Sequence, residues 1–280
     1  MEILTIPEFY ERRFGRKTRI LGGVMLELGG ILNMGLFLKV GSMFIVGITG
    51  MSDKGLALPL VMTTLLTLVL VCTVLGGMIS VVITDYIQFS VLSMGLIVAT
   101  ILAIKHLGWD NIFDTVAAHM GEKGFNPLLE EGGFGVEYML WMCFVAGLVS
   151  CAIWPTAVAR ALAAKSPQVV KRQYMWASVS FLIRFLIPYF WGICALVFVV
   201  QHGGDLHQSF FPADPEASAT DNLYGMPIFL SRILPAGLIG LVTAGMLAVF
   251  MSTHDSYLLC WSSVLTQDVV APLAGNRISE

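Results

Sequence analysis

Blocks of about twenty apolar residues alternate with shorter polar segments along the whole chain. A helix of that length crosses the hydrocarbon core of a bilayer, and within lipid a helix satisfies its own backbone hydrogen bonds. The pattern therefore predicts one transmembrane unit over residues 1–280. Its expected spans are residues 20–46, 58–77, 79–104, 137–158, 175–200 and 228–266. We expect an all-α polytopic membrane protein.

The composition agrees with this prediction and excludes other classes of protein. Hydrophobic residues make up 56% of the chain, charged residues make up 12%, and the mean hydropathy is +0.80. A soluble domain has roughly 25% charged residues, so a cytosolic enzyme and a disordered chain are both excluded. The net charge of −3 offers no basic surface for nucleic acid. Neither a G-x-S-x-G nor an H-E-x-x-H string occurs, so we do not expect an enzyme.

The basic residues predict an orientation, because Lys and Arg accumulate in cytoplasmic loops. One side of the predicted spans carries Arg12, Arg13, Arg16, Lys17, Arg19, Arg160, Lys165, Lys171, Arg172 and Arg277. The opposite side carries Lys54, Lys105, Lys123 and Arg232. We therefore expect both ends of the chain to be cytoplasmic and the protein to lie in the plasma or inner membrane. The polar segments 105–136 and 201–227 would then face outward.

Polar residues within the predicted spans are candidates for function, because such groups are costly in hydrocarbon. Asn33 lies deep in the first span, where it either bonds to a neighbouring helix or faces a solute. Asp85 lies near the start of the third span, beside Thr84. An acid there is either stabilised by the helix dipole or placed on an ion route.

The fourth span carries a row of candidates on one helical face. Gly147, Cys151 and Trp154 are spaced three or four residues apart, just before Pro155. Small residues in such a row favour close helix packing. A proline at this point also opens a helix and frees carbonyl groups beside a binding cavity. Both interpretations are open from spacing alone.

The last span contains adjacent hydroxyl residues at the end of an uncharged stretch. Helix geometry brings the Val249 carbonyl close to the side chains of Ser252 and Thr253. Three oxygen atoms can gather there without a break in the backbone, and a hard cation prefers oxygen ligands. The alternative is that both hydroxyls simply bond back to their own helix.

Four strings, taken together and in this order, resemble the sodium/solute symporter family, which includes the sodium/proline and sodium/glucose symporters. Residues 5–15, TIPEFYERRFG, are similar to the family's T-x-P-E/D…RF loop. Gly76-Gly77…Val81…Thr84-Asp85…Gln88 resembles its GG-x-x-A-V-x-x-T-D-x-x-Q pattern. Residues 251–268 resemble its M-S-T…L-L…S-S…T-x-D pattern. Pro155…Ala159-Arg160 resembles QPH-x-x-A-R, with Trp154 and Thr156 in place of Gln and His.

The resemblance implies a leucine-transporter-type fold of two inverted repeats of five helices. The six spans would be its core helices three to eight, so we expect the chain to be an incomplete piece of that fold. Solute and sodium would bind near the midplane.

By the same resemblance, Ser252, Thr253 and the Val249 carbonyl would coordinate sodium, and Asp85 would lie on the inner sodium route. Gly147 and Cys151 fall where the proline transporter has aromatic residues that face the substrate. Since those aromatic residues are missing here, the resemblance implies a differently shaped pocket.

Two functions remain open at this stage. The first is sodium-coupled symport of a small organic solute by alternating access. Its partners would be the solute, the lipid bilayer and sodium, which would be co-transported rather than held as a tightly bound cofactor. The alternative is a transporter-like membrane sensor module of a signalling protein, since some relatives of the family are built that way.

Overall fold

The computed structural model describes residues 5–51, 55–130, 134–213 and 219–274. Within the helices, the side chains of residues 77–82 and 152 are left undescribed. Lys54 and Arg277 of the predicted charge distribution therefore lie outside the described residues. Gly77 and Val81 of the second string fall within residues 77–82, whose side chains are not described.

All regular elements in the described residues are helical, which confirms the predicted all-α class. The α-helices are α1 (Ile6–Phe14), α2 (Arg16–Thr49), α3 (Ala57–Leu107), α4 (Trp109–Met120), α5 (Val136–Leu140), α6 (Ser150–Ile153), α7 (Pro155–Leu162), α8 (Pro167–His202), α9 (Gly204–Phe210), α10 (Gly225–Ile233), α11 (Ala236–Val264) and α12 (Ala271–Ala274). The 3₁₀-helices are η1 (Gly121–Gly124) and η3 (Asn222–Tyr224), and the π-helices are η2 (Trp141–Val149) and η4 (Leu265–Val270).

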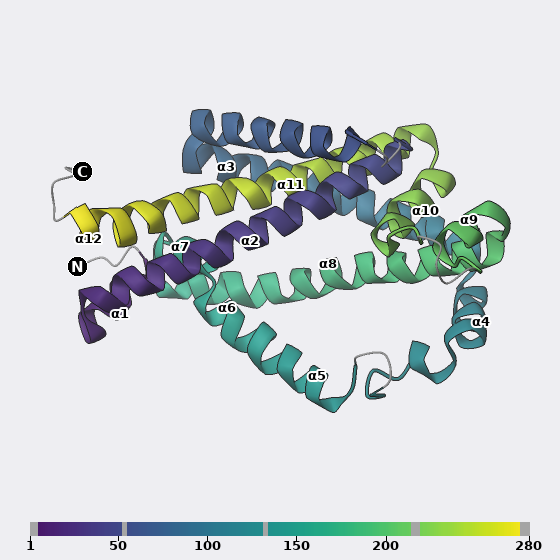
Figure 1. Ribbon diagram of the computed structural model, residues 1–280, viewed down its shortest axis with the longest axis horizontal. Coiled ribbons are helices and arrows are strands. Elements are labelled where there is room, and N and C mark those ends of the chain that lie inside the picture. Colours follow the sequence, from purple (N-terminus) through teal and green to yellow (C-terminus); the bar gives the residue numbers. More distant parts are fainter. Residues whose placement is uncertain (1–4, 52–54, 131–133, 214–218, 275–280) are drawn as a thin grey trace.

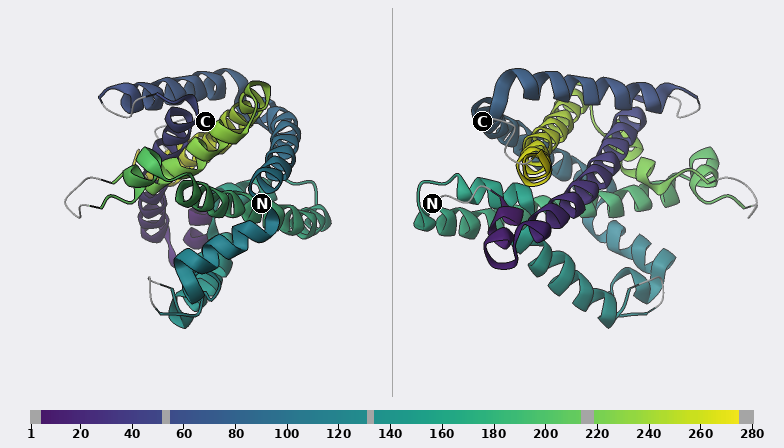
Figure 2. Two further views of the ribbon diagram at one scale, coloured as in Figure 1. Left: turned by 90° about the vertical axis from the view of Figure 1, so that its right-hand side faces the viewer. Right: turned by 60° about the vertical axis from the view of Figure 1, so that its left-hand side comes forward.

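Within the described residues, five helical segments are long and apolar enough to cross a membrane. They are Arg16–Thr49, Ala57–Gly76, Ile83–Leu107, Pro167–His202 and Ala236–Ala274. The second and third belong to the single element α3, whose two arms turn back on each other in Figures 1 and 2. Helix hydrogen bonding therefore continues between the predicted spans 58–77 and 79–104, although the chain reverses its direction there.

Two other predicted spans, 137–158 and 228–266, are interrupted at prolines. The apolar segment Val136–Val149 is shorter than a full crossing, and Trp154 adopts an extended backbone before Pro155 begins α7. The predicted span 228–266 is divided at Leu234 and Pro235, which separate α10 from α11. Proline lacks a backbone N–H and disfavours a helical conformation in the residue before it, which explains both breaks.

Helix α11 lies at the centre of the bundle and packs mainly against α3 and α2. Glycines let α2 come close to it. A Cβ atom added at Gly30 would lie 2.4 Å from the Trp261 ring, and one at Gly41 would lie 2.7 Å from the Phe250 ring. Small residues at helix contacts are typical of membrane bundles. Since α2 and α11 fit together in this way, the candidate sodium residues lie on a helix with closely packed neighbours.

Candidate functional site

The three candidate sodium residues lie within one uninterrupted α-helix. Val249, Ser252 and Thr253 are all half-buried on α11, and the backbone around them stays α-helical. Val249 packs at the edge of the main hydrophobic core. The next two residues, His254 and Asp255, are buried. The structure thus keeps the three candidates on one short stretch of helix, as their spacing predicts.

The hydroxyl groups of Ser252 and Thr253 differ from most hydroxyls nearby. In the part of the chain that the structure describes, neither hydroxyl makes a hydrogen bond. By contrast, Ser262 and Ser263 on the same helix both donate to the Leu259 carbonyl, over 3.1 and 2.9 Å. Bonding back to the helix, the alternative interpretation of the pair, is therefore not what the structure shows. Both oxygens remain available for a ligand.

A buried polar contact joins α11 to the first arm of α3 beside this pair. The Thr73 hydroxyl is shared between the Val69 carbonyl of its own helix, at 2.8 Å, and the carboxylate of Asp255. His254 contacts the Phe250 carbonyl through Nδ1 at 2.9 Å and the Met34 carbonyl of α2 through Nε2 at 3.4 Å. These contacts fix α11 against both neighbours, one turn beyond Ser252.

Asp85 is paired with a basic residue. Arg160 on α7 donates to Asp85 Oδ2 over 2.8 Å, and the same nitrogen lies 2.5 Å from Ser256 Oγ. Ser256 in turn donates to the Ser252 carbonyl over 2.9 Å. The other oxygen of Asp85 is buried without a partner among the described residues. A short polar chain therefore connects the predicted ion-route acid to the backbone of the predicted sodium site.

Sequence reasoning gave no role in this cluster to Thr73, Arg160 or Ser256. The partners are far apart in the chain: Asp85 and Arg160 are separated by 75 positions, and Thr73 and Asp255 by 182 positions. Two features of the sequence could have pointed to these contacts. Asp255 and Ser256 are polar and come shortly after the hydroxyl pair, and Arg160 stands at the end of the string that begins at Pro155.

The structure separates the predicted substrate-facing residues. Trp154 contacts α11, with its ring 6.1 Å from the Tyr257 ring and 6.4 Å from the Trp261 ring, centroid to centroid. Gly147 lies in the π-helix η2, and Cys151 is exposed. η2 packs chiefly against α5 and α6, and this arm diverges from the bundle in Figure 1. The structure therefore brings Trp154, but not Gly147 or Cys151, to α11.

Asn33 is half-buried on α2. It lies next to Met34, whose carbonyl contacts His254. No hydrogen bond of its side chain occurs within the described residues. Its predicted role toward a solute stays a prediction, as do those of Gly147, Cys151 and Trp154.

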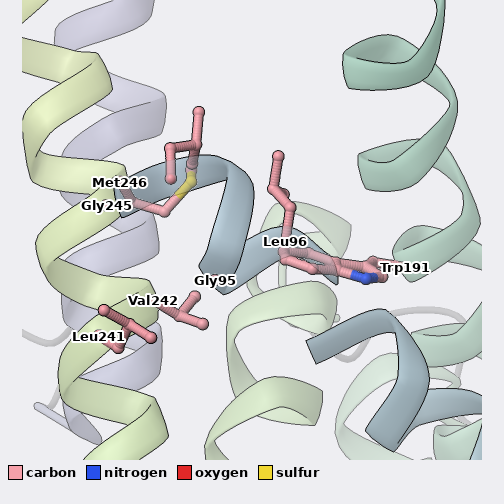
Figure 3. A pocket seen from close by; sticks show the side chains of 8 residues that line it. Gly95, Leu96, Trp191, Leu241, Val242, Gly245 and Met246 are labelled. Carbon is pink, nitrogen blue, oxygen red and sulfur yellow. The ribbon is translucent and has the colours of Figure 1, made fainter. Parts of the chain in front are cut away.

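An apolar crevice lies between the second arm of α3, α8 and α11 (Figure 3). Its lining comprises Leu92, Gly95, Leu96, Trp191, Leu241, Val242, Gly245 and Met246. The Trp191 indole N–H already donates to Thr100 over 3.0 Å. Since sites for small molecules combine apolar walls with a few placed polar groups, this crevice lacks the polar anchors of a solute site.

Comparison with known proteins defines the class. The model of the "Sodium:solute symporter family" matches residues 1–277. The chain is 27% identical to a sodium/glucose cotransporter of Vibrio parahaemolyticus, over 98% of this chain and 52% of the relative. It is 24% identical to sodium/myo-inositol cotransporter 2 of Mus musculus, over 99% and 43%. It is 25% identical to a sodium/proline symporter of Staphylococcus aureus, over 99% and 50%.

The chain belongs to the sodium:solute symporter family, and the resemblance found in its four strings is confirmed. It spans about half the length of the curated relatives that it matches. The family and the apolar helices together support a multi-pass membrane protein.

Proposed function

We propose that this protein couples the movement of sodium down its gradient to the inward transport of a small organic solute, by alternating access. The observation that carries the proposal is the pair of unbonded hydroxyls, Ser252 and Thr253, on a helix of a chain that belongs to the sodium:solute symporter family. Sodium is cargo in this account, and it exchanges its water shell for protein oxygens.

In the proposed site, the Ser252 and Thr253 hydroxyls and the Val249 carbonyl provide three of the oxygen ligands. Asp85 lies on the route by which sodium leaves toward the cytoplasm. Because Arg160 holds one oxygen of Asp85, a departing sodium ion competes with a tethered cation for this carboxylate. The predicted orientation, with both ends of the chain cytoplasmic, belongs to the same proposal.

The solute is to be found by experiment, because the curated relatives are named for glucose, myo-inositol and proline. The complete protein is reconstituted in proteoliposomes, and uptake of labelled sugars, inositols, amino acids and carboxylates is measured with an inward gradient of sodium or of choline. The proposal expects one class of solute to accumulate only with sodium. Equal uptake in choline would contradict it.

A paired variant links transport to the site. S252A/T253A is expected to reduce sodium-driven uptake and to raise the sodium concentration needed for half-maximal uptake. S262A/S263A is the matched control, since it removes two adjacent hydroxyls from the same helix that already bond to Leu259. Unchanged sodium dependence in S252A/T253A would contradict the assignment of the site.

A further inference from the structure

The first helix is held firmly against the bundle, although it is only nine residues long. Thr5 caps α1 by accepting a hydrogen bond from the Glu8 N–H over 3.2 Å, and its hydroxyl donates to Asp268 Oδ1 over 2.8 Å. Pro7, in the first turn, is fully buried. The two ends of the described chain thus meet through one carboxylate, and Figure 1 shows α1 and α12 at the same end of the molecule.

Arg19 strengthens this attachment from α2. Its Nε donates to Asp268 Oδ1 over 2.8 Å, and another of its nitrogens donates to Glu11 over 2.7 Å. The Asp268 side chain has no exposed surface. Gly15, at φ +85°, makes the turn that lets α1 fold back beside the start of α2. Arg19 therefore joins α1 to both α2 and η4.

This arrangement leaves unbalanced positive charge where α1 ends and α2 begins. Glu11 is occupied by Arg19, and Glu8 lies 3.9 Å from Arg12. Arg13 lies over the Phe14 ring at 5.5 Å. The side chains of Arg12, Arg13, Arg16 and Lys17 are all exposed. Among the described residues, Arg16 and Lys17 form no ion pair.

Large apolar side chains are exposed beside these charges. Phe9 is 57% exposed and Phe14 is 61% exposed. We call Phe9, Arg12, Arg13, Phe14, Arg16 and Lys17 the basic corner. The apolar run of α2 starts at Ile20, only three residues later. The basic corner therefore lies at the level where a membrane-spanning helix meets the lipid headgroups.

We propose that the basic corner binds the headgroups of anionic phospholipids. Clustered Lys and Arg residues directly beside a membrane span complement negative headgroups, and exposed aromatic residues on a short amphipathic helix bury themselves at the boundary between headgroups and acyl chains. Lys165 lies on the connection from α7 to α8, and Lys171 and Arg172 lie near the start of α8, at the same end of the bundle (Figure 1). The proposed binding of lipid headgroups to the basic corner does not rest on the proposed coupling of sodium to solute transport.

Binding is measured by native mass spectrometry of the complete protein, released from detergent with phosphatidylglycerol or with phosphatidylcholine of the same acyl chains. Each basic residue near an anionic surface raises the binding constant by a factor of about five. Wild-type protein is expected to prefer phosphatidylglycerol, and R12Q/R13Q/R16Q/K17Q is expected to weaken this binding by about tenfold or more.

Two controls make the result decisive. R12K/R13K/R16K keeps the charge and is expected to retain the preference for phosphatidylglycerol, whereas a merely structural role of the arginine side chains would lose it. K105Q/K123Q/R232Q removes basic residues of the opposite side and is expected to behave like wild type. The proposal is overturned if wild type shows no preference, or if the glutamine variant of the basic corner keeps it.

Discussion

Arg160 on α7 donates a hydrogen bond to Asp85 on α3 over 2.8 Å, and the same guanidinium nitrogen reaches Ser256 on α11. This single side chain joins three segments that are far apart in sequence. Ser256 continues the connection to the Ser252 carbonyl. The acid that sequence reasoning places on an ion route is therefore linked to the predicted sodium residues by direct contacts.

The pairing of Arg160 with Asp85 is tested by a double-mutant cycle. R160Q and D85N are each expected to lower the stability of the purified protein, and the double variant should lose less than the sum of the two. The Arg160 side chain is 47% exposed and that of Asp85 is 18% exposed, so solvent screening limits the coupling to about 0.5–1 kcal/mol. Tryptophan fluorescence on heating measures the effect. K165Q, an exposed neighbour, serves as the control, and strictly additive losses would contradict the pairing.

The close approach of α2 to α11 is tested at Gly30. G30A places a Cβ atom 2.4 Å from the Trp261 ring, so the ring or the helices must shift, at a cost of about 1–3 kcal/mol. G29A is the matched control, because a Cβ atom there meets nothing within 4 Å. Thermal unfolding of both variants in the same detergent gives the comparison. Equal stability of the two would show that α2 and α11 do not pack as described.

The contact between Thr73 and Asp255 predicts a cost for removing the hydroxyl. T73V keeps the shape of the side chain but takes away a partner of the buried carboxylate, which should destabilise the protein by about 1–2 kcal/mol. T63V removes an exposed hydroxyl that bonds only to the Pro59 carbonyl of its own helix, and it should change stability little. Thermal unfolding separates the two cases, and a T73V variant as stable as T63V would rule out an energetic role for the contact.

The exposed Cys151 allows a test of the predicted solute-facing position. In a variant that keeps Cys151 as its single cysteine, the transported solute is expected to slow labelling by a maleimide, because the solute would cover the thiol. A variant that keeps only Cys72, which is also exposed, should be labelled at the same rate with and without solute. Labelling of Cys151 that is indifferent to solute would remove it from the predicted pocket.

The hydropathy pattern predicts much of the fold, because the length and apolarity of a membrane helix are properties of a single segment. The helical class and the segments at 16–49, 167–202 and 236–274 follow from it directly. The break at Leu234 and Pro235 is harder to predict, since the apolar pattern runs through it. The continuity of α3 is hard to predict for the opposite reason. The sequence pattern divides this segment into two spans, whereas the structure joins them without a break in the helix.

The candidate site is predictable only in its local part. The spacing of Val249, Ser252 and Thr253 is fixed by the helix itself. The contacts of Asp85 and Asp255 depend on how α3, α7 and α11 pack together, so their partners Arg160 and Thr73 could not be named beforehand. The same holds for Thr5 and Asp268, which are 263 residues apart. The inverted-repeat arrangement stays a prediction from the family resemblance.

Equilibrium binding of radiolabelled sodium to the purified protein tests the central claim most directly. The account predicts that S252A/T253A weakens sodium binding by about tenfold or more, a loss of about 1.4 kcal/mol, because two oxygen ligands are removed. S262A/S263A should bind sodium like wild type, since its hydroxyls are already bonded to Leu259. Sodium binding by S252A/T253A with wild-type affinity would contradict the account.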